Sequence, residues 1–185
     1  MRTAFKEWAV VVDALERGEQ ILIFRKGGIH EGKGGFKPEH SQFLFFPTRF
    51  HQQRESVLPE AQERFDRISP LFHDQQLSIH SWAEVADAIQ IRDLQMAKRL
   101  GNQHIWREEV IGQRFEWGRE QSIHCLLLRV HKLPRGVVIP MLPEYGGCKS
   151  WIELAEPIET EGSSAVIPDG EFSRRLDEIR SILKN

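Results

Sequence analysis

The sequence predicts an α+β fold: a mostly antiparallel central sheet with flanking helices and a C-terminal helix. Helical and strand-like segments come first, apolar strand-like runs occupy the middle of the chain, and an amphipathic helical pattern closes it. This order differs from the regular strand–helix alternation that indicates a parallel sheet. A chain of 185 residues, 40% of them hydrophobic, is long enough to bury one core of ordinary size.

The N-terminal segment predicts a helix, a strand and a glycine-rich loop. Residues 4–17 place apolar side chains at helical spacing before Gly18, which favours a helix. Three consecutive valines at 10–12 leave open a strand in a hairpin with residues 20–25. The short apolar run at 20–25 itself predicts a buried strand, and five glycines follow within residues 27–35.

The middle of the chain alternates apolar runs with polar helical segments. Residues 42–46 form an apolar run ended by Pro47, and residues 56–68 predict a polar helix. Residues 76–91 look extended. Residues 92–100 look helical, with a glycine as the stop signal directly after them.

The next segments predict the centre of the sheet and a long loop. Residues 108–117 and 122–131 suggest a strand pair around the turn at 118–120. The second of these runs is apolar on most of both faces, which is typical of a central strand. Prolines and glycine pairs predict a loop over 132–148, before a last strand at 149–154.

The chain ends in a connector and a helix. Residues 156–170 are acidic and contain serine, glycine and proline. Apolar residues at 172, 176, 179 and 183 then follow a helical period, with Asp169 or Gly170 near the helix start. We therefore expect residues 1–155 to form a single α+β domain, on which the connector and helix of residues 156–185 pack.

Composition narrows the class of protein. Charged residues make up 28% of the chain and the net charge is −2, so no overall basic excess indicates nucleic-acid binding, although a local basic patch stays open. The two cysteines form no CxxC pair, and no run is long and apolar enough for a membrane helix. We expect a cytoplasmic protein with no membrane partner.

The glycine-rich loop resembles a phosphate-binding P-loop only in part. Residues 27–33 fit the first seven positions of that pattern, but Gly34 stands where a magnesium-binding hydroxyl is needed. Pro38 and its neighbours also make a poor helix start. The remaining functional interpretation is a backbone anion site, in which basic side chains meet phosphate and small residues let the backbone approach. Its residues are Arg25, Lys26, Gly27 and Gly28.

Catalytic candidates are few. Glu31-x-Lys33 matches half of a metal-dependent nuclease site, which His51 and a further carboxylate would complete. Cys148 beside a lysine could carry a reactive thiol. The histidines have no fixed metal-ligand spacing, so we assign no metal, and the cofactor is unknown. We favour a non-enzymatic protein, with a metal-dependent nuclease or phosphodiesterase as the alternative.

Arginines and aromatic residues elsewhere could contact phosphates and bases. Arg114 and Arg129 lie on the predicted central strands, and Tyr145, Lys149 and Trp151 lie in the following loop and strand. Together with the basic glycine loop they predict a binding site for nucleic acid or another phosphate-bearing ligand. The deciding question is whether the loops at 25–36 and 143–151 share one cleft.

Four segments carry a family resemblance and span residues 6–151. They are residues 6–8 (KEW) with 25–31 (RKGGIxE), 43–48 (FLFFPT) with 51–52 (HQ), 114–115 (RF) with 128–130 (LRV), and 143–151 (PEYGGCKSW). In this order they resemble a bacterial family known as domain of unknown function 1802. The resemblance implies no established activity.

Association of that family with restriction-endonuclease domains in fused proteins implies a restriction or defence setting and a restriction-type protein partner. The resemblance therefore favours an accessory protein that recognises nucleic acid. A structural protein–protein interaction module, with the two loops as its interface, is the third hypothesis.

Overall fold

A computed structural model gives the structure of the protein. Side chains at 31–32, 35–36 and 72–73 are outside the description, although the backbone there is included. The described residues are 1–26, 31–32, 35–36, 40–49, 54–65, 67–68, 72–73, 75–118, 120–147 and 149–184.

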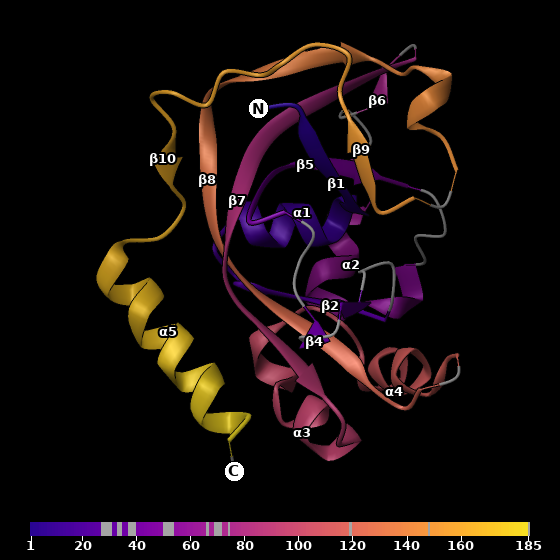
Figure 1. Cartoon of the computed structure of the whole chain (residues 1–185), viewed down its shortest axis with the longest axis vertical. Coiled ribbons are helices and arrows are strands. Elements are labelled where there is room, and N and C mark those ends of the chain that lie inside the picture. Colours follow the sequence, from indigo (N-terminus) through magenta and orange to yellow (C-terminus); the bar gives the residue numbers. More distant parts are fainter. Residues whose placement is uncertain are drawn as a thin grey trace.

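One curled, mostly antiparallel sheet organises the molecule, with strand order β10-β8-β7-β5-β1-β9. β2 also pairs with β8, and β6 with β7. Two long strands, β7 and β8, bend around the interior and run from one end of the molecule to the other (Figure 1). The strands of this sheet are β1 (Thr3–Trp8), β2 (Leu22–Arg25), β5 (Gln42–Thr48), β6 (Phe72–His73), β7 (Gln76–Ile91), β8 (Ile123–Pro140), β9 (Trp151–Glu153) and β10 (Ser164–Ala165).

Helices fill and flank the curl. α1 lies inside it (Figure 1), and six of its eight residues are buried. The main apolar core joins α1 with side chains of β2, β5, β8 and the 94–115 region. The helices are α1 (Ala9–Glu16), α2 (Pro59–Phe65), α3 (Leu94–Arg99), α4 (Glu108–Glu116) and α5 (Asp169–Ile182), and the short strands β3 (Glu31–Gly32) and β4 (Gly35–Phe36) form a separate ladder.

These elements confirm the predicted fold class and several of its parts. β2, β7, β9, α2, α3 and α5 lie within or across the segments predicted for them. Ile179 of α5 is buried in the main core. Nη1 of Arg175, on the same helix, donates a hydrogen bond to the carbonyl of Gly18 at 2.5 Å. The domain boundary at residue 155 stays a prediction. None of the described helices is long and apolar enough to cross a membrane.

The predicted helix over 4–17 is partly wrong. Residues Thr3–Trp8 form β1, which pairs in parallel with β5, and only Ala9–Glu16 are helical. The spacing of apolar residues in this stretch is compatible with a helix and with a strand. Pairing with β5 and β9 stabilises a strand in its first half. The alternative hairpin with residues 20–25 is also wrong, because β2 pairs with β8.

The predicted strand over 108–117 is wrong, because Glu108–Glu116 form α4. Ile111 and Phe115, four positions apart, are buried on one face, and Glu108 and Glu109 stand in the first turn, where the helix dipole favours acidic groups. The predicted loop over 132–148 is also wrong in its first half. β8 continues to Pro140 and pairs with the start of β7, with an irregularity between Ile79 and Ser81.

Candidate functional site

A cleft of about 520 Å³ opens beside the ends of three strands, a size common among ligand sites. β1 and β5 are parallel, so their C-terminal ends lie at the same edge of the sheet. The end of β2 and the segment 141–150 complete the walls. Four basic side chains line the cleft: Lys6, Arg25, Arg49 and Lys149.

Arg25 connects the two sides of the cleft. Its Nη2 donates to the hydroxyl of Ser150 at 2.5 Å, and its Nη1 lies 3.6 Å from Oε2 of Glu7. Its guanidinium also lies over the ring of Phe5, at 4.6 Å from the centroid. Arg25, at the start of the first predicted loop, therefore lies in one cleft with Tyr145, Lys149 and Ser150 of the second. Most of the loop after Lys26 lies outside the described residues.

A buried carboxylate and a second arginine lie behind this wall. Glu7 is 3% exposed and accepts a hydrogen bond from its neighbouring amide, Trp8 N, at 2.7 Å. The guanidinium of Arg114 lies 3.9 Å from the ring of Trp106 and 5.3 Å from that of Trp8. Burial lowers the pKa of Arg114 to about 10, against the opposing effect of Glu7. Arg114 therefore supports the cleft wall from within.

Hydrogen bonds to backbone groups hold the segment 141–150 in place. Nζ of Lys6 donates to the carbonyls of Gly146 and Gly147, at 3.1 and 3.2 Å. The hydroxyl of Tyr145 accepts from the amide of Ala155 at 2.8 Å, and its ring packs edge-on against Phe46. The aromatic ring of Tyr145 is thus a fixed part of the cleft wall.

Lys26 and Arg129, two of the predicted ligand-binding residues, are not among the residues that line the cleft, and they contact other chain segments. Nζ of Lys26 donates to the carbonyls of Phe115, Glu120 and Ser122, and burial lowers its pKa. Arg129 pairs with Asp169 at the start of α5. Both are therefore occupied in holding chain segments together.

Trp151, a third predicted ligand-binding residue, packs into the core. Its ring lies 4.6 Å from that of Phe5 and 5.1 Å from that of Phe43. Of the seven predicted ligand-binding residues that the structure describes, Arg25, Tyr145 and Lys149 line the cleft.

The catalytic candidates fall where the structure does not describe side chains. His51, Cys148 and the loop glycines Gly27 and Gly28 lie outside the described residues, and Glu31 belongs to β3 with its side chain undescribed. Within the described part of the chain, no group of three histidine, cysteine or acidic residues could hold a metal ion. The nuclease alternative therefore gains no support from the described residues.

The sequence prediction omitted several residues that line the cleft. Lys6, Glu7 and Arg49 sit at or near the ends of β1 and β5, and Met141 follows β8 directly. Only the parallel pairing of β1 with β5 brings these strand ends together, and parallel strands 40 residues apart leave no local signal in sequence. In the sequence, Arg49 follows the apolar run of β5 closely, but Lys6 lies within β1 and has no such mark.

The fold has counterparts among solved structures. A mutant of the ASCH protein from Zymomonas mobilis is 14% identical, with a TM-score of 0.50 over 96% of this chain and 94% of that chain. The unmutated ASCH protein of the same organism is 15% identical, with a TM-score of 0.48 over 95% and 93%. The protein is thus an α+β protein with an ASCH-like fold and a basic cleft.

The chain belongs to the DUF1802 family, a domain of unknown function whose model matches residues 4–178. This confirms the resemblance seen in the sequence. No curated protein matches the chain significantly.

Proposed function

We propose that the cleft binds a phosphate-bearing ligand and that this ligand is nucleic acid. The observation that carries the proposal is the local charge. Four basic side chains line the cleft, and the carboxylate among its lining residues, Glu7, is buried against Arg25. The positive charge is therefore local, because the net charge of the whole chain is −2.

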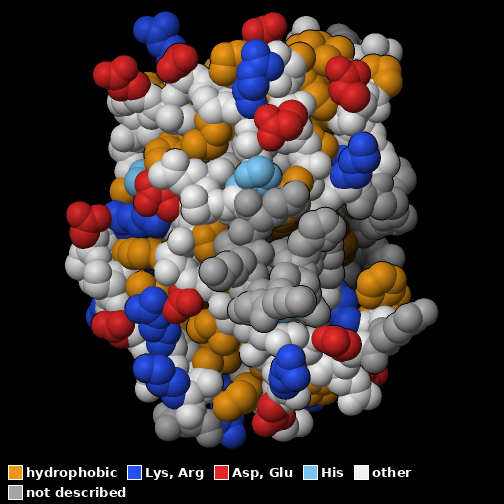
Figure 2. Space-filling model, viewed as in Figure 1, with side chains coloured by type: hydrophobic (Ala, Val, Ile, Leu, Met, Phe, Trp, Pro, Cys, Tyr) orange, Lys and Arg blue, Asp and Glu red, His pale blue; other side chains and the backbone are white. Residues whose placement is uncertain are grey.

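The face of the molecule in Figure 2 carries charges of both signs. Figure 2 shows Lys and Arg side chains interspersed with Asp and Glu over the described part of that face. Because charges of both signs are mixed there, the field of this face attracts phosphate weakly. Electrostatic attraction to a polyanion would therefore act mainly at the cleft, where the walls also lower the effective dielectric.

The apolar walls favour a nucleotide over a small inorganic anion. Trp8, Phe46, Pro47, Met141 and Tyr145 contribute rings and aliphatic surface next to the basic groups. Phosphate contacts fix a nucleic acid in place, whereas bases and sugars need apolar or aromatic surface to pack against. A cleft with both kinds of surface suits a ligand with both kinds of group.

Each basic residue has a distinct role in this proposal. Arg25 is oriented by Glu7 and Ser150, so its guanidinium is preorganised for phosphate. Lys149 is exposed at the rim and would meet the ligand first. Lys6 and Arg49 add positive charge to the walls.

Titrating labelled DNA and RNA oligonucleotides by fluorescence anisotropy, at two salt concentrations, tests the proposal. The association of the family with restriction endonucleases makes DNA an essential probe. Four phosphate contacts predict an affinity about 50- to 150-fold weaker at 200 mM than at 50 mM salt. Absence of binding at the lower salt concentration would refute the proposal.

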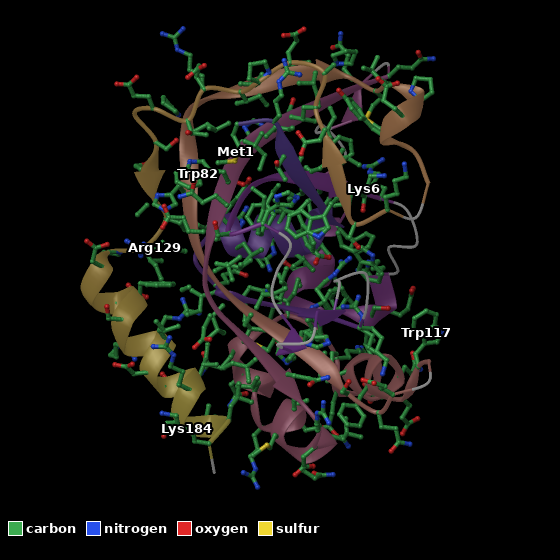
Figure 3. All side chains as sticks on the ribbon, in the orientation of Figure 1. Met1, Lys6, Trp82, Trp117, Arg129 and Lys184 are labelled. Atoms are coloured by element: carbon green, nitrogen blue, oxygen red, sulfur yellow. The ribbon has the colours of Figure 1, made fainter. Side chains whose placement is uncertain are left out.

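A matched pair of variants separates the cleft from general charge. Lys149→Glu and Lys184→Glu make the same change in net charge, but Lys184 lies at the end of α5, across the molecule from the cleft residue Lys6 (Figure 3). We expect Lys149→Glu to weaken binding at least about tenfold, since it replaces an attraction by a repulsion, and Lys184→Glu to leave it nearly unchanged. If the two variants lose affinity equally, nucleic acid does not bind in the cleft.

A further inference from the structure

Trp117 is the most exposed large hydrophobic residue of the described chain, with 71% of its surface open to solvent. The other four tryptophans are buried or half-buried. A tryptophan carries one of the largest aromatic surfaces among the side chains, so the exposed indole of Trp117 offers a face on which another ring can stack.

The chain around Trp117 is held firmly while its side chain points outward. Its amide donates to the carbonyl of Gln113 at 3.0 Å, at the end of α4. Gly118 follows with φ +86, a conformation that favours glycine and turns the chain away from the helix. Lys26 donates to carbonyls on both sides of this turn, those of Phe115 and Ser122. Hydrogen bonds therefore hold the described backbone on both sides of position 119, and the indole of Trp117 is exposed beside it.

This turn is connected to the cleft by two routes. Lys26, which anchors it, directly follows Arg25 in the cleft wall. Arg114, on the same helix as the turn, lies over the ring of Trp8, which also lines the cleft. Trp117 and the cleft residue Lys6 lie on one side of the molecule, and Arg129 and Lys184 lie on the other (Figure 3).

We propose that Trp117 stacks on an unpaired base of a single-stranded nucleic acid whose phosphates occupy the basic cleft. The inference rests on the proposed function and specifies its ligand. A base inside a duplex is already stacked on both faces, whereas the bases of a single strand are free to stack on an aromatic side chain.

The charged residues that the structure describes beside Trp117, Glu116 and Glu120, favour a base over a phosphate at this position. Glu116 and Glu120 are both exposed next to the turn and would repel a phosphate. A base is uncharged, so it tolerates these carboxylates while the backbone of the strand runs to the basic groups of the cleft. A protein partner would instead be expected to need apolar surface around its central aromatic residue.

Measuring the affinity of three probes for Trp117→Ala, Trp117→Phe and the parent protein tests the inference. The probes are a single-stranded oligonucleotide of about 12 nucleotides, its duplex form and an abasic strand of equal length. For the single strand we expect Trp117→Ala to bind roughly five- to 150-fold more weakly. Trp117→Phe should recover most of this loss, because its ring still stacks. The duplex and the abasic strand should bind both variants as they bind the parent.

The outcomes separate the two proposals. If the parent protein binds none of the probes, the proposed function fails and the inference with it. If the parent and Trp117→Ala bind the single strand equally well, the stacking inference is overturned but the proposed function stands. The exposed indole would then be assigned to contact with a protein partner. An equal loss on all three probes also overturns stacking. Since Trp117 is exposed, both variants should keep the parental melting temperature, and a large decrease would count against the stacking role.

Discussion

The guanidinium of Arg25 donates a hydrogen bond to the hydroxyl of Ser150 across 2.5 Å, although the two residues are 125 positions apart in sequence. The same guanidinium lies 3.6 Å from the carboxylate of Glu7. One side chain thus touches the strand β1, ends β2 and reaches the segment before β9. The geometry of the basic cleft depends on this arginine and on the carboxylate that orients it.

Glu7→Gln is expected to destabilise the fold by about 3 kcal/mol, the lower end for breaking a buried ion pair, because Arg25 is partly exposed. Glutamine keeps the shape of the side chain and an oxygen that accepts from the amide of Trp8. The loss of stability therefore measures the effect of removing the negative charge. The free energy of unfolding in urea measures it. Glu153→Gln, which changes an exposed carboxylate on β9, serves as the control and should cost less than about 0.5 kcal/mol.

The sequence was sufficient for the fold class because its local patterns were clear in most elements. The alternation at 76–91 and the helical period before the C-terminus need only neighbouring residues to be read. The errors arose where local and tertiary preferences compete. Residues 3–8 became a strand through pairing with β5 and β9, which sit far along the chain.

The site was harder to predict than the fold. Two of the basic residues predicted near glycines, Arg25 and Lys149, line the cleft, and their contact with a ligand stays a prediction. Lys26 has the same local setting as Arg25, yet it faces the opposite way and binds three carbonyls. Arg25 is the last residue of β2 and Lys26 follows it, so the two adjacent basic residues have different surroundings that the local sequence does not reveal.

Lys26→Met is expected to lower the free energy of unfolding by about 2 kcal/mol, because three carbonyls lose a charged donor and some of them recover water. Thermal or urea unfolding would show this. Lys98→Met is the matched control: its ammonium pairs with the exposed Glu108 at 2.8 Å, and such surface pairs contribute under about 1 kcal/mol. A smaller loss at Lys26 than at Lys98 would contradict the structural role assigned to Lys26.

His104 predicts a dependence of stability on pH. Its side chain is 5% exposed and its Nδ1 accepts from the amide of Trp106, and burial lowers its pKa to about 4 from 6.5. His104 is therefore protonated below about pH 6.5 in the unfolded chain, but only below about pH 4 in the native protein. Stability is full above the unfolded pKa and falls through this window, by about 3 kcal/mol in total.

The variant His104→Asn isolates this contribution. The asparagine oxygen is suited to accept from the amide two residues on, but it does not titrate. Burial also lowers the pKa of His124 and His131, so the parent protein has other contributions of the same sign. The informative quantity is the difference in unfolding free energy between parent and variant, measured from pH 7 to pH 4. If this difference stays constant with pH, protonation of His104 does not contribute to the pH dependence of stability.

Cys125 is expected to resist thiol reagents in the native protein. It is fully buried on the central strand β8, and burial raises the pKa of its thiol, so the reactive thiolate is scarce as well as inaccessible. In a Cys148→Ser variant, which leaves Cys125 as the sole cysteine, labelling should proceed only through unfolding and should accelerate steeply at the urea midpoint. Rapid stoichiometric labelling without denaturant would show that β8 opens locally between β2 and β7, the two strands that flank this residue.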